Sequence, residues 1–391
     1  MVSTIILFIV ILGLLVFVHE LGHFALARRM RMGVDEFGFG FPPRAFGAWK
    51  NKQTGKWDFI YGTRGLSEEQ RGAHGTIYSM NWLPLGGFVK IKGEQGDQAK
   101  DPDSFAYQRP WRRALVLGAG VMMNMLFAFL LISIGFGLGL PTVINDSVSS
   151  QATVIDKRVQ IVDVEPGTPA ESAGLQPGDV ITSVDGESVI SVEQFQTYTR
   201  PRLDTTMSVT YTRGNDVGVA TITPQALYEE DEGAIGIALA LTGFVRYPWY
   251  QAIWMGAQTT ISVTWQILSS FGQLIGSAFG GEKTNIDVAG PVGVAALTGQ
   301  IAKLGFIYIL QFAALLSINL AIINAVPFPA LDGGRLLFLL IEKIRNKALN
   351  QRVEAAIHNI GFIILIVLVL AVTVKDISRF TGIFEGIKNI F

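Results

Sequence analysis

The sequence contains no cysteine, few histidines and little charge. Its 391 residues include 0 Cys and 4 His, and only 16% are charged. Without thiols the chain forms no disulfide and offers a metal no thiolate, so a transition metal would have to be bound by His and carboxylate groups. The formal net charge of -1 provides no basic excess to neutralise phosphates, which argues against nucleic acid as a partner.

Hydrophobic residues are abundant, at 49% of the chain with a mean hydropathy of +0.38. This composition favours the lipid bilayer as a partner and predicts a multi-pass α-helical membrane protein. The first apolar run has no basic residue before it, whereas Arg28, Arg29 and Arg31 follow it. We therefore expect a retained helix with its N-terminus outside rather than a signal peptide. The four expected transmembrane helices are residues 4–27, 114–140, 304–326 and 355–374.

The expected N-terminal membrane half, residues 1–140, has a basic middle. Residues 28–113 carry fifteen Lys/Arg against nine Asp/Glu, so the positive-inside rule predicts a cytoplasmic position. Within residues 34–95, the apolar stretches 37–43 and 80–91 are interrupted by Gly and Pro, which suits strands or re-entrant loops that line a cavity. We expect a membrane-associated β-hairpin here; a small cytoplasmic β-sheet is the alternative.

The middle of the chain is acidic and then uncharged. Residues 141–246 carry six Lys/Arg against fifteen Asp/Glu, and their short alternating runs predict strands of a water-soluble α+β domain, residues 150–242, outside the cytoplasm. Residues 247–281 carry no charge, but apolar and Gln/Ser positions fall on opposite faces, which predicts an amphipathic helix at the membrane interface. Residues 300–391 form the expected C-terminal membrane half.

One stretch of the first apolar segment carries chemistry. His19-Glu20-Leu21-Gly22-His23 places two imidazoles at i and i+4 on one helix face, where both can bind one zinc ion while Glu20 acts on a water held by the metal. Ionisable groups inside an apolar span are costly and need a compensating partner. A metal supplies one, and a hydrogen-bonded structural cluster is the other interpretation.

Two histidines leave a catalytic zinc short of one protein ligand. His74 lies in a polar stretch and His358 has no partner motif, whereas Asp332 follows an apolar helix that Pro327 and Pro329 would break. If the four helices alternate in direction, Asp332 and the histidine pair lie at the same depth. We therefore favour Asp332 as the third ligand; its other interpretation is an ordinary turn residue.

HELGH in the first membrane helix, together with Asn-Ala-Val-Pro-Phe-Pro-Ala-Leu-Asp-Gly-Gly at 324–334, resembles the site-2 protease family of intramembrane metalloproteases. The single outer domain is similar to that of the bacterial type that regulates envelope stress. The resemblance implies that His19, His23 and Asp332 bind Zn²⁺ and that Glu20 is catalytic. It also implies a substrate-backbone contact by Asn324, with Asn319 as a second candidate; the alternative for each amide is a hydrogen bond to a neighbouring helix.

Two further elements extend this resemblance. Pro84-Leu-Gly-Gly-Phe-Val-Lys90 is similar to the family's membrane-dipping hairpin, so Gly86, Gly87 and Phe88 are candidate substrate contacts, reached by strand addition of an unwound substrate. The chain departs from the family at Gly120-Val-Met-Met-Asn124, where the family often has Gly-Pro-x-x-Asn. We expect this departure to affect only local packing.

Residues 165–181, EPGTPAESAGLQPGDVI, resemble a bacterial PDZ domain, a type that is permuted in this family. Ala234, Ile235, Gly236 and Ile237 match its peptide-binding loop, whose backbone N–H groups can capture a peptide C-terminus. A steric role, excluding substrates with bulky outer domains, is equally compatible with the sequence.

The resemblance implies a zinc metalloendopeptidase for regulated intramembrane proteolysis in the bacterial inner membrane, with its active site toward the cytoplasm. Its expected substrates are single-span membrane proteins, such as anti-sigma factors or remnant signal peptides, already shortened by a first protease. The alternative is a non-catalytic PDZ adaptor with a structural zinc, against which Glu20 argues because a structural zinc needs no such residue. A zinc transporter would need further ligands within the membrane.

Overall fold

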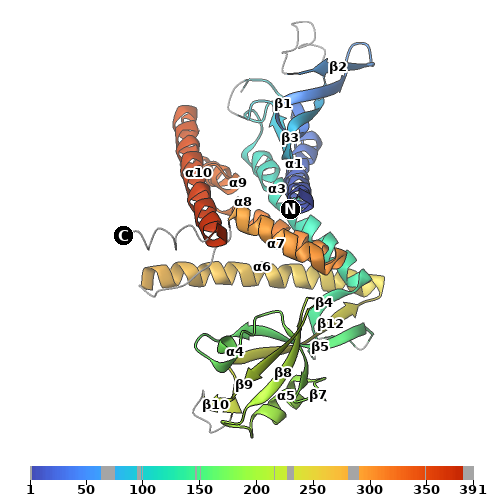
Figure 1. The fold of residues 1–391 in the computed structure, drawn as a ribbon. Coiled ribbons are helices and arrows are strands. Elements are labelled where there is room, and N and C mark those ends of the chain that lie inside the picture. Colours follow the sequence, from blue (N-terminus) through green and yellow to red (C-terminus); the bar gives the residue numbers. More distant parts are fainter. Residues whose placement is uncertain are drawn as a thin grey trace. The chain divides into compact units, whose positions relative to one another are not determined.

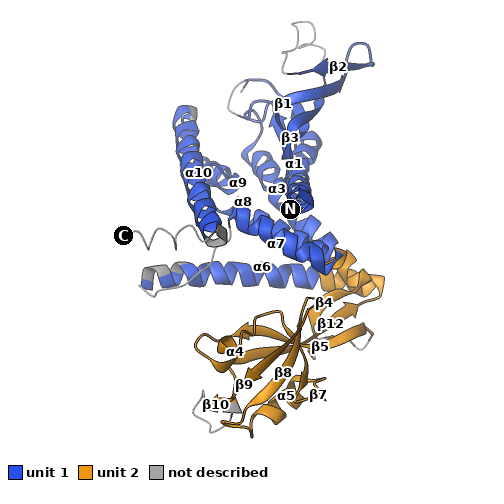
Figure 2. Ribbon diagram, viewed as in Figure 1, with its two compact units in different colours: residues 1–132, 257–305, 309–391 blue, residues 133–256, 306–308 orange. Residues whose placement is uncertain are grey.

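The computed structural model describes residues 2–62, 75–94, 98, 100–145, 148–149, 151–214, 216–226, 233–280, 290–347 and 349–381. The chain divides into two compact units (Figure 2). Unit 1 comprises residues 1–132, 257–305 and 309–391, and unit 2 comprises residues 133–256 and 306–308. His74, one of the four histidines, lies outside the described residues.

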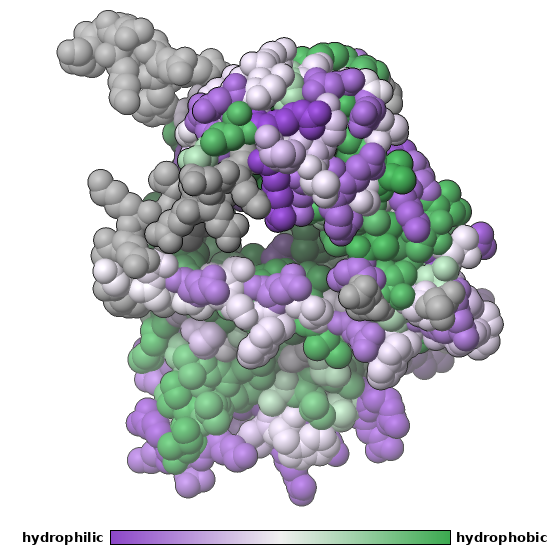
Figure 3. Space-filling model, turned by 90° about the horizontal axis from the view of Figure 1, so that it is seen from below, coloured by the Kyte–Doolittle hydropathy of each residue, from purple (hydrophilic) through white to green (hydrophobic). Residues whose placement is uncertain are grey.

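Four described helices are long and apolar enough to cross a membrane, so the chain is a membrane protein, in agreement with the sequence prediction. Large hydrophobic side chains lie exposed along them, and hydrophobic areas are visible on the surface (Figure 3). The helices are α1 (Val2–Arg29), α3 (Pro110–Leu138), α8 (Phe306–Ala325) and α10 (Gln351–Thr381) (Figure 1). In α10, the candidate span is residues 352–378.

A three-stranded sheet in unit 1 stands where a β-hairpin was expected. Its strands are β1 (Val34–Lys50), β2 (Trp57–Tyr61) and β3 (Ile77–Ile91), in the order β2-β1-β3. Both long strands are folded on themselves: residues 36–39 of β1 pair with 87–90 of β3 on one side and with 77–80 on the other. Trp49, Ile60 and Ile77 form a small buried cluster within this sheet.

Glycines bring this sheet against α1. A Cβ on Gly86 would lie 2.6 Å from Val16 Cγ1, and one on Gly87 would lie 3.0 Å from Gly38 O and 3.2 Å from Phe17. Gly86 also has a φ of +130°, a conformation that favours glycine. These close approaches fix the second half of β3 alongside the helix that carries HELGH.

Three more helices belong wholly or partly to unit 1. α6 (Trp249–Gly280) is one continuous helix and is not among the four membrane-spanning candidates of the described chain. α7 (Pro291–Leu304) and α9 (Asp332–Arg345) were not anticipated from the sequence. α7 begins with Pro at its first position, which is a usual helix start.

Unit 2 contains the strands expected for the outer domain, in the order β4-β12-β5-β6-β8-β9. β8 and β9 form a hairpin in which Arg213 pairs with Asp216. Val159, Ile161, Phe195, Val209 and Ile222 lie in its buried core. The elements are β4 (Leu140–Val143), β5 (Thr153–Val164), α4 (Pro169–Ser172), β6 (Val180–Val184), β7 (Glu187–Ser188), α5 (Val192–Thr199), β8 (Met207–Arg213), β9 (Asp216–Ile222), β10 (Gln225–Ala226), β11 (Gly233–Ala234) and β12 (Ile237–Arg246).

Candidate metal centre

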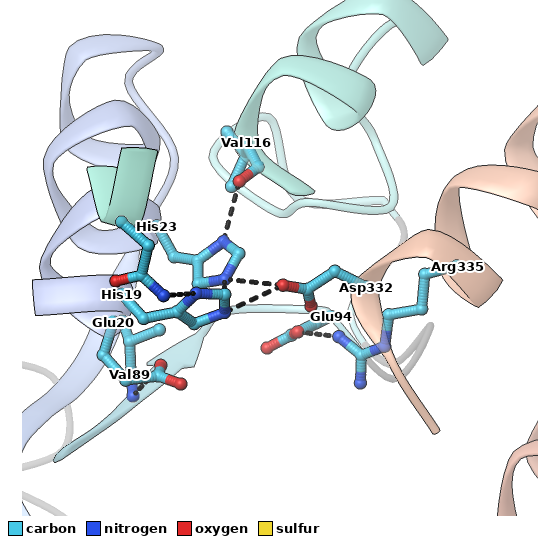
Figure 4. Close-up of polar contacts among 9 residues, drawn as sticks. His19, Glu20, His23, Val89, Glu94, Val116, Asp332 and Arg335 are labelled. Atoms are coloured by element: carbon cyan, nitrogen blue, oxygen red, sulfur yellow. Dashed lines mark hydrogen bonds and ion pairs between the residues drawn. The ribbon is translucent and has the colours of Figure 1, made fainter. Parts of the chain in front are cut away.

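His19, His23 and Asp332 meet in unit 1, although the aspartate is 309 residues beyond the second histidine. The histidines project from α1, and Asp332 faces them from the first turn of α9 (Figure 4). Both imidazoles are buried, and the Asp332 side chain is 19% exposed. The site is therefore shielded by protein but still reachable.

The three ligand atoms form a nearly equilateral triangle. His19 Nε2 and His23 Nε2 are 3.2 Å apart, and Asp332 Oδ2 lies 3.0 Å from the first and 3.1 Å from the second. With zinc bonds of about 2.0–2.2 Å, tetrahedral ligand atoms lie about 3.3–3.6 Å apart. The observed triangle is close to this spacing, so the three residues fit one face of a tetrahedral zinc site.

Hydrogen bonds to the other ring nitrogens decide which atoms are free to bind a metal. His23 Nδ1 lies 2.8 Å from the carbonyl oxygen of Val116, which only accepts, so the proton is on Nδ1 and Nε2 carries a lone pair. That lone pair faces a carboxylate oxygen and a second imidazole. A cation among the three would be attracted to every one of these atoms.

Asn124, on α3, makes the corresponding contact with His19. Its amide nitrogen Nδ2 lies 3.2 Å from His19 Nδ1, and the residue is completely buried. A metal at His19 Nε2 requires the proton on Nδ1, and the same amide rotated by 180° would present Oδ1 to the ring as the acceptor. Asn124 therefore contacts a candidate ligand directly, whereas the departure from the family pattern is at Val121, and its effect on local packing stays a prediction.

Gly120 explains how α3 can pass so near the site. A Cβ at this position would lie 2.4 Å from His23 Nε2 and 2.6 Å from His19 Nε2. Gly22 provides the matching gap on α1, since a Cβ there would lie 2.4 Å from Ala119 O. Side chains larger than hydrogen at either position would enter the space that the two helices share at the histidine pair.

Glu20 lies beside the triangle and is held by the sheet. Its Oε2 accepts a hydrogen bond of 3.1 Å from the backbone N–H of Val89 in β3 (Figure 4). The general-base candidate is thus fixed by a strand that the sequence analysis linked to substrate. Arg335, on the first turn of α9, forms an ion pair with Glu94 near Asp332.

The loop before Asp332 is compact because of its glycines. A Cβ on Gly333 would lie 2.3 Å from Val326 O, and one on Gly334 would lie 2.3 Å from Phe328 O. Leu-Asp-Gly-Gly therefore lets the loop fold back on the start of α9, which turns Asp332 toward α1. The prolines at 327 and 329 lie between the end of α8 and this helix.

The remaining predicted site residues have different surroundings. Asn319 and Asn324 are half-buried on α8, and the loop to Asp332 follows that helix. Gly86 and Gly87 are buried against α1, and Phe88 is half-buried. In unit 2, Ile235 and Gly236 are buried, and their carbonyl oxygens accept hydrogen bonds from Ala170 and Glu165. Substrate or peptide binding at these positions stays a prediction.

Comparison with known proteins finds similar proteases and a similar PDZ domain. A protein of Bacillus subtilis (strain 168), "Regulator of sigma-W protease RasP", is 30% identical over 464 aligned positions, which cover 97% of this chain and 99% of that protein. "Zinc metalloprotease RasP" of Bacillus licheniformis is 30% identical, covering 96% of this chain and 99% of that protein. The PDZ domain of an SdrC-like protein from Listeria monocytogenes is 28% identical over 22% of this chain, with a TM-score of 0.21.

The family model described as "Peptidase family M50" matches residues 7–63 and 64–368. The matched region contains both HELGH and the loop that ends in Asp332. The chain belongs to peptidase family M50.

Proposed function

We propose that this M50 peptidase is a zinc-dependent endopeptidase that cleaves single-span membrane proteins within or near the bilayer. The observation that carries the proposal is the triangle of His19 Nε2, His23 Nε2 and Asp332 Oδ2 beside Glu20. Zinc is the metal in the names of several relatives, and a His₂-carboxylate set with one open position is typical of catalytic zinc.

Each residue at the site has a distinct role in this proposal. His19, His23 and Asp332 hold the metal, Asn124 and the Val116 carbonyl orient the two imidazoles, and Glu20 accepts a proton from the attacking water. When bound there, zinc supplies Lewis acidity that lowers the pKa of water and polarises the scissile carbonyl. The Val89 N–H keeps the Glu20 carboxylate beside the site instead of leaving it free to rotate.

The sheet gives a route for an unwound substrate. Helical peptide bonds are hydrogen-bonded within the helix, so a transmembrane substrate must become extended before cleavage. The second half of β3 lies next to α1 and reaches Glu20 through Val89, so a chain that adds along this strand would pass close to the general base. Asn324 would hold the substrate backbone from α8, and Asn319 of the same helix is a second candidate for this contact.

We place the site toward the cytoplasmic side of the bacterial inner membrane. Arg28 and Arg29 end α1 within two turns of His23, and positive charge favours the cytoplasmic side. Because α3 would then carry the chain back across the membrane, unit 2, our PDZ-like domain, would lie outside the cytoplasm. There its 234–237 loop would bind a peptide C-terminus, or the domain would exclude substrates that a first protease has not shortened.

The test is Glu20→Gln in the full chain in lipid nanodiscs, with a single-span membrane protein as substrate. Because glutamine cannot accept the proton, we expect cleavage to fall by about 100-fold or more while zinc stays stoichiometric. Val10→Ala, at an exposed position of the same helix, is the matched control and should cleave normally. Undiminished cleavage by Glu20→Gln would refute the mechanism, and stoichiometric zinc without any cleavage by the wild type would favour the adaptor.

A further inference from the structure

The loop that precedes Asp332, residues 326–331, is hydrogen-bonded to a polar side chain of α10. The backbone N–H of Ala330 donates a hydrogen bond of 2.8 Å to Nδ1 of His358, which lies on α10. Ala330 is two residues before the candidate third ligand. His358 is not one of the proposed metal ligands and has no catalytic role in the proposed function.

This contact is unusual within the loop. Pro327 and Pro329 have no N–H, while those of Val326, Phe328 and Leu331 donate to carbonyl oxygens of the segment 323–328 itself. Among the described hydrogen bonds, the Ala330 N–H is thus the loop donor that reaches another helix. The loop's position relative to the rest of unit 1 depends on that acceptor more than on its internal bonds.

Ala330 also has a backbone conformation that needs support. Its φ is +82°, which is uncommon for a residue with a Cβ and persists only where the surroundings hold it. The reversal of the chain at this residue sets the direction of the next two residues, and hence of the Asp332 carboxylate. An acceptor placed on the Ala330 N–H stabilises this conformation directly.

The imidazole is itself fixed in place. Phe338 of α9 packs against the His358 ring with centroids 5.2 Å apart at 64°. One turn further along α10, a Cβ on Gly361 would lie 2.5 Å from Pro329 Cβ and 2.6 Å from Pro329 O. His358 and Gly361 share a helix face, since they are three residues apart, and both meet the short segment 329–330.

The hydrogen bond from Ala330 determines the tautomer of the His358 imidazole. A backbone N–H only donates, so Nδ1 of His358 must be unprotonated and carry the lone pair, which places the proton of the neutral ring on Nε2. An asparagine offers its Oδ1 at the same number of bonds from Cβ as Nδ1, whereas leucine has similar bulk and no acceptor.

We propose that His358 is a positioning residue for the zinc site: by holding Ala330, it fixes the direction of Asp332 toward His19 and His23. The proposal rests on the proposed function, because it takes Asp332 as a zinc ligand. In this proposal, the face of α10 that carries His358 and Gly361 keeps Asp332 in place without contacting the metal or the substrate.

The experiment measures metal binding in the full chain. Wild type, His358→Leu, His358→Asn and Gly361→Ala are purified in nanodiscs, and the zinc Kd of each is measured by competition with a chelator. The visible absorption of the Co²⁺-substituted proteins reports the ligand geometry independently of activity. Ile364→Ala, at an exposed position of α10, is the control, and thermal unfolding checks that each variant is folded.

Loss of an orienting partner of a metal ligand typically weakens binding by about 10–100-fold. We expect His358→Leu and Gly361→Ala to raise the zinc Kd by about tenfold or more and to change the Co²⁺ spectrum, and His358→Asn to stay within about threefold of wild type. A folded His358→Leu with wild-type Kd and spectrum overturns the proposal. Equal losses in His358→Leu and His358→Asn also overturn it, because packing of the ring would then matter rather than its acceptor.

A further variant, compared with the wild type, separates this inference from the proposed function on which it rests. His23→Ala is measured in the same series, and it should lose stoichiometric zinc. If His23→Ala binds zinc as tightly as the wild type, the metal centre itself is wrongly assigned. If only the His358 variants match the wild type, the centre stands and the positioning role fails.

Discussion

Replacing Gly120 by alanine tests the metal centre with a single methyl group. The new Cβ would lie 2.4 Å from His23 Nε2 and 2.6 Å from His19 Nε2. A carbon and a nitrogen that are not bonded approach to about 3.5 Å at their optimum, so the histidines or α3 must move by roughly 1 Å. A zinc site tolerates ligand distances within about 0.2 Å of their ideal values.

We therefore expect Gly120→Ala to weaken zinc binding by about 100-fold or more and to abolish cleavage, since it displaces two ligands at once. The overpacking should also lower the free energy of unfolding by about 1–3 kcal/mol. Chelator competition gives the zinc Kd, thermal unfolding in nanodiscs gives the stability, and a single-span substrate gives the activity.

Gly118→Ala is the matched control on the same helix, because a Cβ there has nothing within 4 Å. Alanine is a better helix former than glycine by about 1 kcal/mol, so this variant should be at least as stable as the wild type and fully active. Equal zinc affinity in the two variants would show that the histidine ring nitrogens do not face Gly120, and the site as described would be wrong.

Two other substitutions test separate parts of the chain. Asn124→Ala removes the partner of His19 Nδ1, and we expect a loss of about 10–100-fold in zinc affinity by the same competition assay; an unchanged Kd would exclude an orienting role. Arg213→Leu leaves the fully buried Asp179 carboxylate without its two 2.7 Å ion-pair contacts, which should destabilise unit 2 by about 3–5 kcal/mol in denaturant unfolding of the full chain. The exposed ion pair between Arg158 and Asp156 is the control. Arg158→Leu should lower the free energy of unfolding by less than about 1 kcal/mol.

The sequence predicted those features that depend on composition and on short patterns. Four long apolar runs predicted the four helices, because a bilayer demands about twenty apolar residues whatever the tertiary packing. The strands of unit 2 followed from alternating residues and turn signals. Asp332 followed from an argument about depth, and the structure brings it within 3.1 Å of both histidines.

Other features depend on contacts between distant segments, which composition does not encode. Gly120 and Asn124 were visible as the two ends of a family pattern, but their contact with the histidine rings requires α3 to cross α1 at Gly22. The Val89 N–H was unpredictable for the same reason, since its bond to Glu20 depends on how β3 packs against the helix. α9 was not predicted from the sequence, in which Asp332 could also be an ordinary turn residue.

The site also bears on how unit 1 holds together in a membrane. Apolar faces give helices no hydrophobic reason to associate there, since lipid tails are equally apolar, so close packing and polar contacts must do so. Among the described polar contacts, Ser317 donates to Asn124 O between α8 and α3, Asp376 of α10 accepts from Gly290 and Gly293 at the start of α7, and His358 accepts from Ala330 N–H. A cation bound by His19, His23 and Asp332 would join α1 to α9 in the same way, so the chemistry of the centre and the assembly of the helices would depend on the same residues.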